Sequence, residues 1–276
     1  MRYLGQIFDQ TRKKEPLVQC ITNFVTVNDC ANMILAAGGT PSMSHVEAEA
    51  AEAVRAADAL VCNMGAIEDT GAMILAGKEA NSLGIPVILD PVAAGGTSLR
   101  RETAKKLLKE VHFSVIRGNV SEIRSLAGES VTGKGVDAAA LDVITDENLP
   151  RAVSRIRQLA EQTGSVIAVS GKTDVISDAT RTVLIRNGCA AMSRITGSGC
   201  MVTALIGCFC GAAKELPLEA AVTGMTVMGI AGEEAEKRML KNGTGNATFR
   251  NDLIDAVFNF TEKQLMEDMK IEVYKG

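Results

Sequence analysis

The stretch Ile85-Pro-Val-Ile-Leu-Asp90 decides the fold, because it is the clearest buried strand in the chain. Residues 69–83 before it have the pattern of a helix that stops at Gly84, and residues 99–111 after it predict another helix. Short apolar runs predict further strands at residues 18–21, 40–43, 59–63, 115–117 and 166–170. Strands and helices that alternate at this spacing are typical of βαβ units. The sequence therefore predicts an α/β fold, with a mostly parallel central sheet and helices on both faces.

The remaining segments extend this pattern. Further helices are expected at residues 28–37, 46–57, 119–126, 151–163, 216–240 and 244–267, and an antiparallel addition to the sheet at residues 175–177 and 182–186. Residues 128–150 have the composition of a looser connection, but it does not shift enough to mark a domain boundary. We expect residues 1–276 to form a single domain.

Composition excludes several classes of function. A formal net charge of -4 and an aromatic content of 3% give no basic face and few stacking rings, so we expect no nucleic-acid partner. Seven cysteines without a CxxC pair argue against a disulfide framework or a zinc site and favour a reducing, cytoplasmic location. Residues 195–213 carry no charge, but four glycines and three hydroxyl side chains favour a core helix over a membrane span.

The segment Thr196-Gly-Ser-Gly-Cys200 is the main candidate for chemistry. A glycine-lined loop that runs into an apolar helix leaves backbone N–H groups pointing outward at the positive end of the helix dipole. Such a site suits a phosphate or a developing oxyanion. Cys200 is in the first turn, where we expect a lowered thiol pKa and a role as a proton acceptor. The alternative is a tight turn with a small buried cysteine.

Polar side chains at the predicted strand ends should converge on one edge of the sheet. The polar residues are Asn23, Asn63, Asp90 and Arg117, and the apolar Met43 falls at the same edge. Asp90 and Glu122 are candidates to hold Mg²⁺ with hard oxygen ligands, or else to cap a loop and a helix N-terminus. Arg117 could clamp phosphate oxygens or lie in solvent.

Two other motifs are weaker. Ser170-Gly-Lys-Thr173 resembles the tail of a Walker A loop, but six residues separate Gly164 from Gly171 where the motif has four. His45 and His112 have no partner spacing that would indicate a catalytic triad.

Five segments together closely resemble the hydroxyethylthiazole kinase family of the ribokinase-like superfamily. They are Ile21-Thr-Asn23, Thr40-Pro-Ser-Met43, Val87-Ile-Leu-Asp-Pro-Val92, Ile116-Arg-Gly-Asn119 with Ser121-Glu-Ile123, and Thr196-Gly-Ser-Gly-Cys200. The cysteine is the most specific element, because most superfamily members have aspartate there. Two positions depart from the family pattern: Ala93 replaces a glycine of DPVGAG, and Ser198 replaces the alanine of TGAGC. The resemblance implies a three-layer ribokinase-like sandwich.

The resemblance also implies a reaction and a set of roles. The family phosphorylates 4-methyl-5-(2-hydroxyethyl)thiazole with ATP and Mg²⁺ in thiamine salvage, as a trimer with substrate pockets at subunit boundaries. The alcohol pocket would be lined by Met43, Gly197 and Asn23, and ATP would be contacted by Arg117 and Ser170. Mg²⁺ would be held by Asp90 and Glu122. The anion hole would consist of Gly197, Ser198, Gly199 and Cys200, and Cys200 would also accept the hydroxyl proton. Alternatives are a hydroxymethylpyrimidine kinase, a dehydratase for hydrated nicotinamide nucleotides of the same fold, and a non-catalytic nucleotide-binding regulator.

Overall fold

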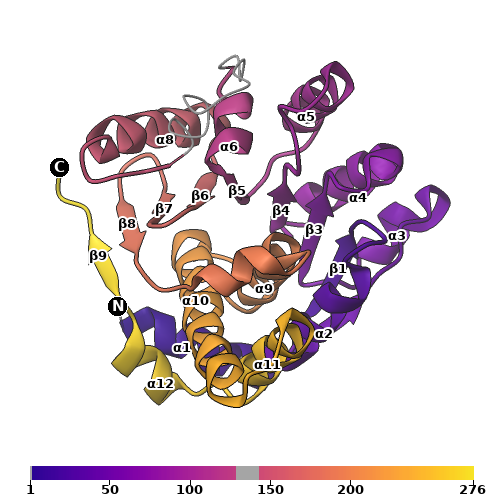
Figure 1. The fold of residues 1–276 in the computed structure, drawn as a ribbon. Helices are drawn as coiled ribbons and strands as arrows, with labels where there is room; N and C mark the ends of the chain where they lie inside the picture. The colour runs from indigo at the N-terminus through magenta and orange to yellow at the C-terminus, as the bar shows by residue number, and fades with distance from the viewer. Residues whose placement is uncertain (1, 129–142) are drawn as a thin grey trace.

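The computed structural model describes residues 2–128 and 143–276, and within them one sheet of nine strands forms the centre (Figure 1). The strand order is β2-β1-β3-β4-β5-β6-β7-β8-β9. The parallel strands are β1 (Leu17–Ile21), β2 (Thr40–Ser42), β3 (Ala59–Asn63), β4 (Val87–Asp90), β5 (Val115–Asn119) and β6 (Val166–Ser170). The antiparallel strands are β7 (Asp174–Ser177), β8 (Thr182–Ile185) and β9 (Ile271–Val273). The predicted strands are confirmed, and most of the predicted connection at residues 128–150 lies outside the described residues.

Helices cover both faces of the sheet and enclose two apolar cores (Figure 1). One face carries α1 (Arg2–Lys14), α2 (Val27–Ala37), α9 (Ser198–Ala212), α10 (Pro217–Asn242), α11 (Asn246–Phe258) and α12 (Glu262–Asp268). The other carries α3 (Ala50–Val54), α4 (Thr70–Ser82), α5 (Ser98–Glu110), α6 (Val120–Leu126) and α8 (Leu149–Thr163). Alternate residues of the central strands enter each core, as the period of a strand requires. The three-layer α/β prediction is confirmed.

Helix α9 lies against the middle of the sheet, where it packs on β1, β3 and β4. Leu205, Ile206 and Phe209 are fully buried, and each such side chain contributes about 1.5–3 kcal/mol by leaving water. A Cβ at Gly207 would lie 2.5 Å from Cγ2 of Val61, so the helix comes this close only because the residue is glycine. In the described ranges, no helix is long and apolar enough to cross a membrane. The core-helix prediction for residues 195–213 is confirmed.

The N-terminal helix α1 was not apparent from the polar composition of its sequence. Leu4, Ile7 and Phe8 recur at helical spacing and are buried. The Phe8 ring lies 6.2 Å from Phe209 and 5.4 Å from Phe260, centroid to centroid. A narrow apolar stripe is therefore enough to dock this helix.

Two helix predictions were wrong in extent. Residues 244–267 form two helices, because Phe260 is buried between them and the Thr261 side chain accepts a hydrogen bond from the Gln264 N–H to begin α12. Residues 46–57 form only a 3₁₀ turn and the short helix α3.

Candidate active site

The polar residues predicted to converge do meet at the carboxyl ends of the parallel strands. Asn63 and Asp90 are paired neighbours in β3 and β4, Arg117 lies in β5, and Asn23 follows β1. The N-terminus of α9 begins at Ser198 and completes the group, since Cys200 in its first turn contacts both Asn23 and Asn63. This is the edge where ligands bind in open α/β sheets.

Two amide groups point at the sulfur of Cys200. Asn63 Nδ2 lies 3.2 Å from Sγ and Asn23 Nδ2 lies 3.5 Å from it. The orientation of Asn23 is fixed, because its Oδ1 accepts hydrogen bonds from both the backbone N–H and the hydroxyl of Thr26. The half-buried sulfur of Cys200 is therefore held as a hydrogen-bond acceptor.

The expected lowering of the Cys200 pKa is wrong. Burial, and then the negative charge of Asp90, raise the pKa of the thiol above its ordinary value. Hydrogen bonds from Thr26, Asn63 and Asn23 act in the opposite direction but do not reverse the shift. The cost of removing a thiolate from water exceeds the stabilisation from these donors. The thiolate is consequently scarce at neutral pH, and it is a stronger base when it forms.

Asp90 is buried at the end of β4, with 1% of its surface exposed. Its Oδ2 accepts hydrogen bonds from Asn63 Nδ2 at 3.0 Å and from Thr203 Oγ1 at 2.9 Å. Burial raises the pKa of Asp90 to about 6, and the charge of Glu122 adds to the rise while Arg117 and Thr203 oppose it. A nearby positive charge would therefore stabilise the ionised carboxylate.

Glu122 connects the start of α6 to the loop after β4. Its Oε2 accepts the Asn119 N–H at 2.8 Å and its Oε1 accepts the Ala93 N–H at 2.9 Å. The Asn119 side chain in turn accepts the Glu122 N–H, which makes a capping box. The helix-capping interpretation of Glu122 is thus borne out, and the carboxylate still has further lone pairs for a ligand.

Asp90 and Glu122 suit a cation that keeps most of its own water. In the described part of the chain, no group of three or more His, Cys, Asp or Glu side chains is placed to hold a metal ion. Mg²⁺ is commonly held by only one or two carboxylates together with water and phosphate oxygens. A buried carboxylate with a raised pKa beside a second carboxylate fits such an ion.

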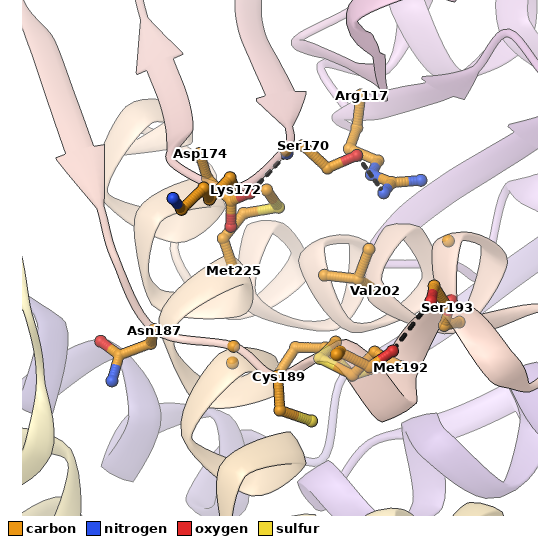
Figure 2. A pocket seen from close by; sticks show the side chains of 17 residues that line it. Arg117, Ser170, Lys172, Asp174, Asn187, Cys189, Met192, Ser193, Val202 and Met225 are labelled. Carbon is orange, nitrogen blue, oxygen red and sulfur yellow. Dashed lines mark hydrogen bonds between the residues drawn. The ribbon is translucent and has the colours of Figure 1, made fainter. Parts of the chain in front are cut away.

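A cavity of about 530 Å³ opens beside the N-terminus of α9 (Figure 2). Arg117, Ser170, Ser198 and Gly199 line one part of it, so the predicted ATP contacts and half of the predicted anion hole share one space. Arg117 Nη2 donates to Ser170 Oγ at 2.7 Å, and the Arg117 Nε is buried without a hydrogen-bond partner. A buried guanidinium with an unpaired donor fits an anionic ligand.

Gly197 is a glycine for geometric reasons. Its φ of +80° is left-handed, and a Cβ there would lie 2.5 Å from Cγ2 of Thr26. Met43 follows the edge strand β2 and is partly buried against the core on the α9 side, as is Cys200. The structure thus places Met43 one strand farther from the centre of the sheet than Asn23, which follows β1.

Comparison with known proteins decides the family. The family model described as the hydroxyethylthiazole kinase family matches residues 8–263. The chain is 44% identical to a hydroxyethylthiazole kinase of Clostridium beijerinckii over 98% of this chain and 96% of the relative. The chain belongs to the hydroxyethylthiazole kinase family. It is also 42% identical to a hydroxyethylthiazole kinase of Methanocella arvoryzae over 98% of each chain.

Solved structures agree with this family assignment. The hydroxyethylthiazole kinase of Pyrococcus horikoshii OT3 superposes with a TM-score of 0.86 at 33% identity, covering 100% of both chains. An ADP complex of Bacillus subtilis pyridoxal kinase superposes with a TM-score of 0.59 at 16% identity, over 79% of this chain and 91% of that one. The second likeness shows the shared ribokinase-like fold. The protein is a kinase of this fold.

The two departures from the hydroxyethylthiazole kinase pattern have different structural consequences. Ala93 has a φ of +55°, a left-handed conformation that glycine adopts without strain. Ser198 occupies the first position of α9 and lines the cavity with its neighbour Gly199. The first departure strains the loop after β4, and the second adds a hydroxyl at the edge of the anion hole.

Sequence reasoning missed most residues of the cavity wall. They come from the turn after β6, from β7, from the segment between β8 and α9, and from α10, and include Lys172, Asp174, Asn187, Cys189, Met192 and Met225 (Figure 2). Asp174 gave the one usable signal, since a carboxylate directly follows the Ser170–Thr173 turn. Its Oδ1 accepts the Gly171 N–H at 2.9 Å, and burial raises its pKa to about 7.

Proposed function

We propose that this kinase transfers the γ-phosphoryl group of ATP to the primary hydroxyl of 4-methyl-5-(2-hydroxyethyl)thiazole in thiamine salvage. The observation that carries the proposal is the position of the α9 N-terminus. On one side it presents the Cys200 sulfur, with the amides of Asn23 and Asn63; on the other, Ser198 and Gly199 line a cavity that also contains Arg117. An alcohol beside the sulfur and a nucleotide in the cavity would meet at this terminus.

The chemistry follows from the groups at that meeting point. The alcohol oxygen forms a bond to the γ-phosphorus while the bond from that phosphorus to the leaving oxygen of ADP breaks, and the hydroxyl proton passes to Cys200 Sγ. Such transfers pass through a loose transition state, so charge stabilisation and positioning supply most of the rate. Arg117 and the backbone N–H groups of residues 197–200 supply positive charge at the phosphoryl oxygens. Bound Mg²⁺, held by Asp90 and Glu122, would neutralise charge on the phosphates.

Cys200 is a secondary contributor in this scheme. The alcohol surrenders its proton late in the transfer, and a general base typically contributes about 10²–10⁴-fold. We assign the contact with the alcohol to Met43, Gly197 and Asn23, and the contact with ATP to Arg117 and Ser170.

A coupled assay for ADP release tests the proposal. The protein is incubated with ATP, Mg²⁺ and the thiazole alcohol, and hydroxymethylpyrimidine serves as the comparison substrate. We expect ADP release that depends on the thiazole and the appearance of its phosphate by mass spectrometry. Faster turnover of the pyrimidine, or no ATP consumption, would overturn the assignment.

We also propose a cytoplasmic homotrimer with substrate pockets at its subunit boundaries. Phe24 and Val25 directly follow Asn23 and are 84% and 57% exposed, an apolar surface that a neighbouring subunit could cover. All seven cysteines are free thiols, which suits a reducing compartment. Light scattering after gel filtration should give three times the chain mass, and Phe24→Asp should reduce it. A monomer in the unchanged protein would refute the trimer.

A further inference from the structure

Asn63, the last residue of β3, connects the proposed proton acceptor, Cys200, with one of the two carboxylates proposed to hold Mg²⁺, Asp90. Its Nδ2 donates to Asp90 Oδ2 at 3.0 Å and also lies 3.2 Å from Cys200 Sγ. Its Oδ1 accepts the Gly65 backbone N–H at 2.8 Å and the Asn23 side-chain amide at 3.2 Å. Only 1% of the residue is exposed, so water does not compete for these bonds.

The orientation of the Asn63 amide is determined by its neighbours. The backbone N–H of Gly65 can only donate, so the oxygen of the Asn63 amide must face it. The NH₂ group is then directed at Asp90 and Cys200. The Asn23 amide reaches the sulfur in the same way, because its oxygen is held by Thr26. The sulfur therefore receives two amide donors whose directions the backbone fixes.

We propose that Asn63 is a positioning residue that holds the sulfur of Cys200 and the carboxylate of Asp90 in a fixed relation through one NH₂ group. The inference rests on the proposed function, in which Cys200 accepts the hydroxyl proton. The hydrogen bond that Asn63 donates to the sulfur favours the anionic form of Cys200, which is the form that can accept a proton. The same amide prevents the carboxylate from turning toward the sulfur, where the two negative groups would repel each other.

Asn63→Asp removes both donors while it keeps the shape and the oxygen that faces Gly65. We expect kcat to fall about 10²-fold, the scale of a general base, with the KM of ATP and of the thiazole changed less than about threefold. The same substitution is then made in the Cys200→Ala background. If Asn63 acts through the sulfur, the two losses overlap. The kcat of the double variant should then be at least about tenfold higher than the value expected if the two single losses multiplied.

The double-mutant comparison separates the inference from the proposed function. A Cys200→Ala enzyme with the unchanged kcat would remove the base role itself. If Cys200→Ala is slow and the two losses in kcat multiply fully in the double variant, the base role of Cys200 is supported. The proposed role of Asn63 is then overturned. Loss of kcat in Asn63→Asp with a matching rise in KM would also overturn it, because general damage to the pocket gives that pattern.

A second measurement does not depend on turnover. Alkylation of Cys200 by iodoacetamide, located by mass spectrometry in protein without nucleotide or metal, should slow several-fold in Asn63→Asp. An unchanged rate would contradict the inference. Asn63→Ser provides a second variant without a new buried carboxylate, should Asn63→Asp fail to fold, and it should slow alkylation in the same direction.

Asn81→Asp is the matched control. Asn81 lies in the last turn of α4 and exchanges two hydrogen bonds with the backbone of His112, away from the carboxyl ends of the strands. It should keep the unchanged kcat and the unchanged alkylation rate at Cys200. An equal effect at Asn81 would show that an Asn→Asp change slows the enzyme wherever it is made, and would overturn the specific role of Asn63.

Discussion

The guanidinium of Arg117 lies against the backbone of Gly199, so that a Cβ added to the glycine would be 2.6 Å from Nη1 of the arginine. Arg117 is 8% exposed and is also hydrogen-bonded to Ser170. The missing side chain at position 199 therefore determines where the buried cation lies. It brings that cation to the first turn of α9, where the helix N–H groups are unpaired.

Gly199→Ala should displace Arg117 and weaken charge stabilisation at the phosphoryl group. We expect kcat to fall at least about tenfold and the KM of ATP to rise, and Gly199→Val to be worse. Steady-state kinetics measure both effects. Gly245→Ala is the control, because a Cβ there meets nothing within 4 Å. A Gly199→Val enzyme at full rate would contradict the proposed anion hole.

The strands and the residues at their ends could be predicted because their signals are local. Apolar runs that end in Asn63, Asp90 or Arg117 already contain both the strand and the side chain that projects from its end. Parallel pairing then brings these side chains together without further information. The break at Phe260 could not be predicted, since it depends on burial against Phe8 at the other end of the chain.

The pKa of Cys200 and part of the cavity wall could not be predicted from local sequence patterns. The helix position of Cys200 indicated a lowered pKa, but burial and Asp90 dominate, and both arise from the tertiary fold. Asn187 and Met225 come from segments without a recognisable motif, and only the tertiary fold places them in the same cavity as Arg117. Long-range packing thus determined what the sequence pattern did not.

Cys200→Ala should lower kcat about 10²-fold with little change in either KM, because the proton acceptor acts only in the transition state. Cys200→Asp should retain activity, since a carboxylate can accept the same proton. The raised thiol pKa also has a consequence for the pH profile. The kcat of the unchanged enzyme should increase as pH rises above neutrality, while that of Cys200→Ala should stay flat over the same range. Parallel profiles would exclude the base role.

Asp174→Asn should stabilise the protein at high pH. Burial raises the folded-state pKa of Asp174 to about 7 from an ordinary 3.8. Between these two pH values, Asp174 keeps its proton in the folded protein and has lost it in the unfolded chain. The free energy of unfolding therefore falls as pH rises, and the full destabilisation by the ionised carboxylate is present above pH 7. Because Asp174 is partly exposed, we expect a gain of about 1 kcal/mol, or a few degrees in Tm, at pH 8.

The gain in Asp174→Asn should shrink at pH 5 and vanish below the ordinary pKa of aspartate. Thermal unfolding of both proteins at several pH values checks this, and the asparagine oxygen can still accept the Gly171 N–H. A constant difference in Tm at all pH values would show that a cause other than titration of the carboxyl group stabilises the variant.

Ala93→Gly should relieve the strain at the one described position where the chain departs from the family glycine. A left-handed alanine costs about 1–2 kcal/mol, and glycine loses about 0.5–1 kcal/mol through the entropy of the unfolded chain. The strain is the larger of the two, so the free energy of unfolding should rise by up to about 1 kcal/mol in urea titrations. The Ala93 N–H that bonds to Glu122 remains, and kcat should not change. Ala127→Gly is the control, because Ala127 has an ordinary φ of -71° after α6, and it should destabilise the protein. An equal change in the free energy of unfolding at both positions would mean that the backbone at Ala93 is not strained.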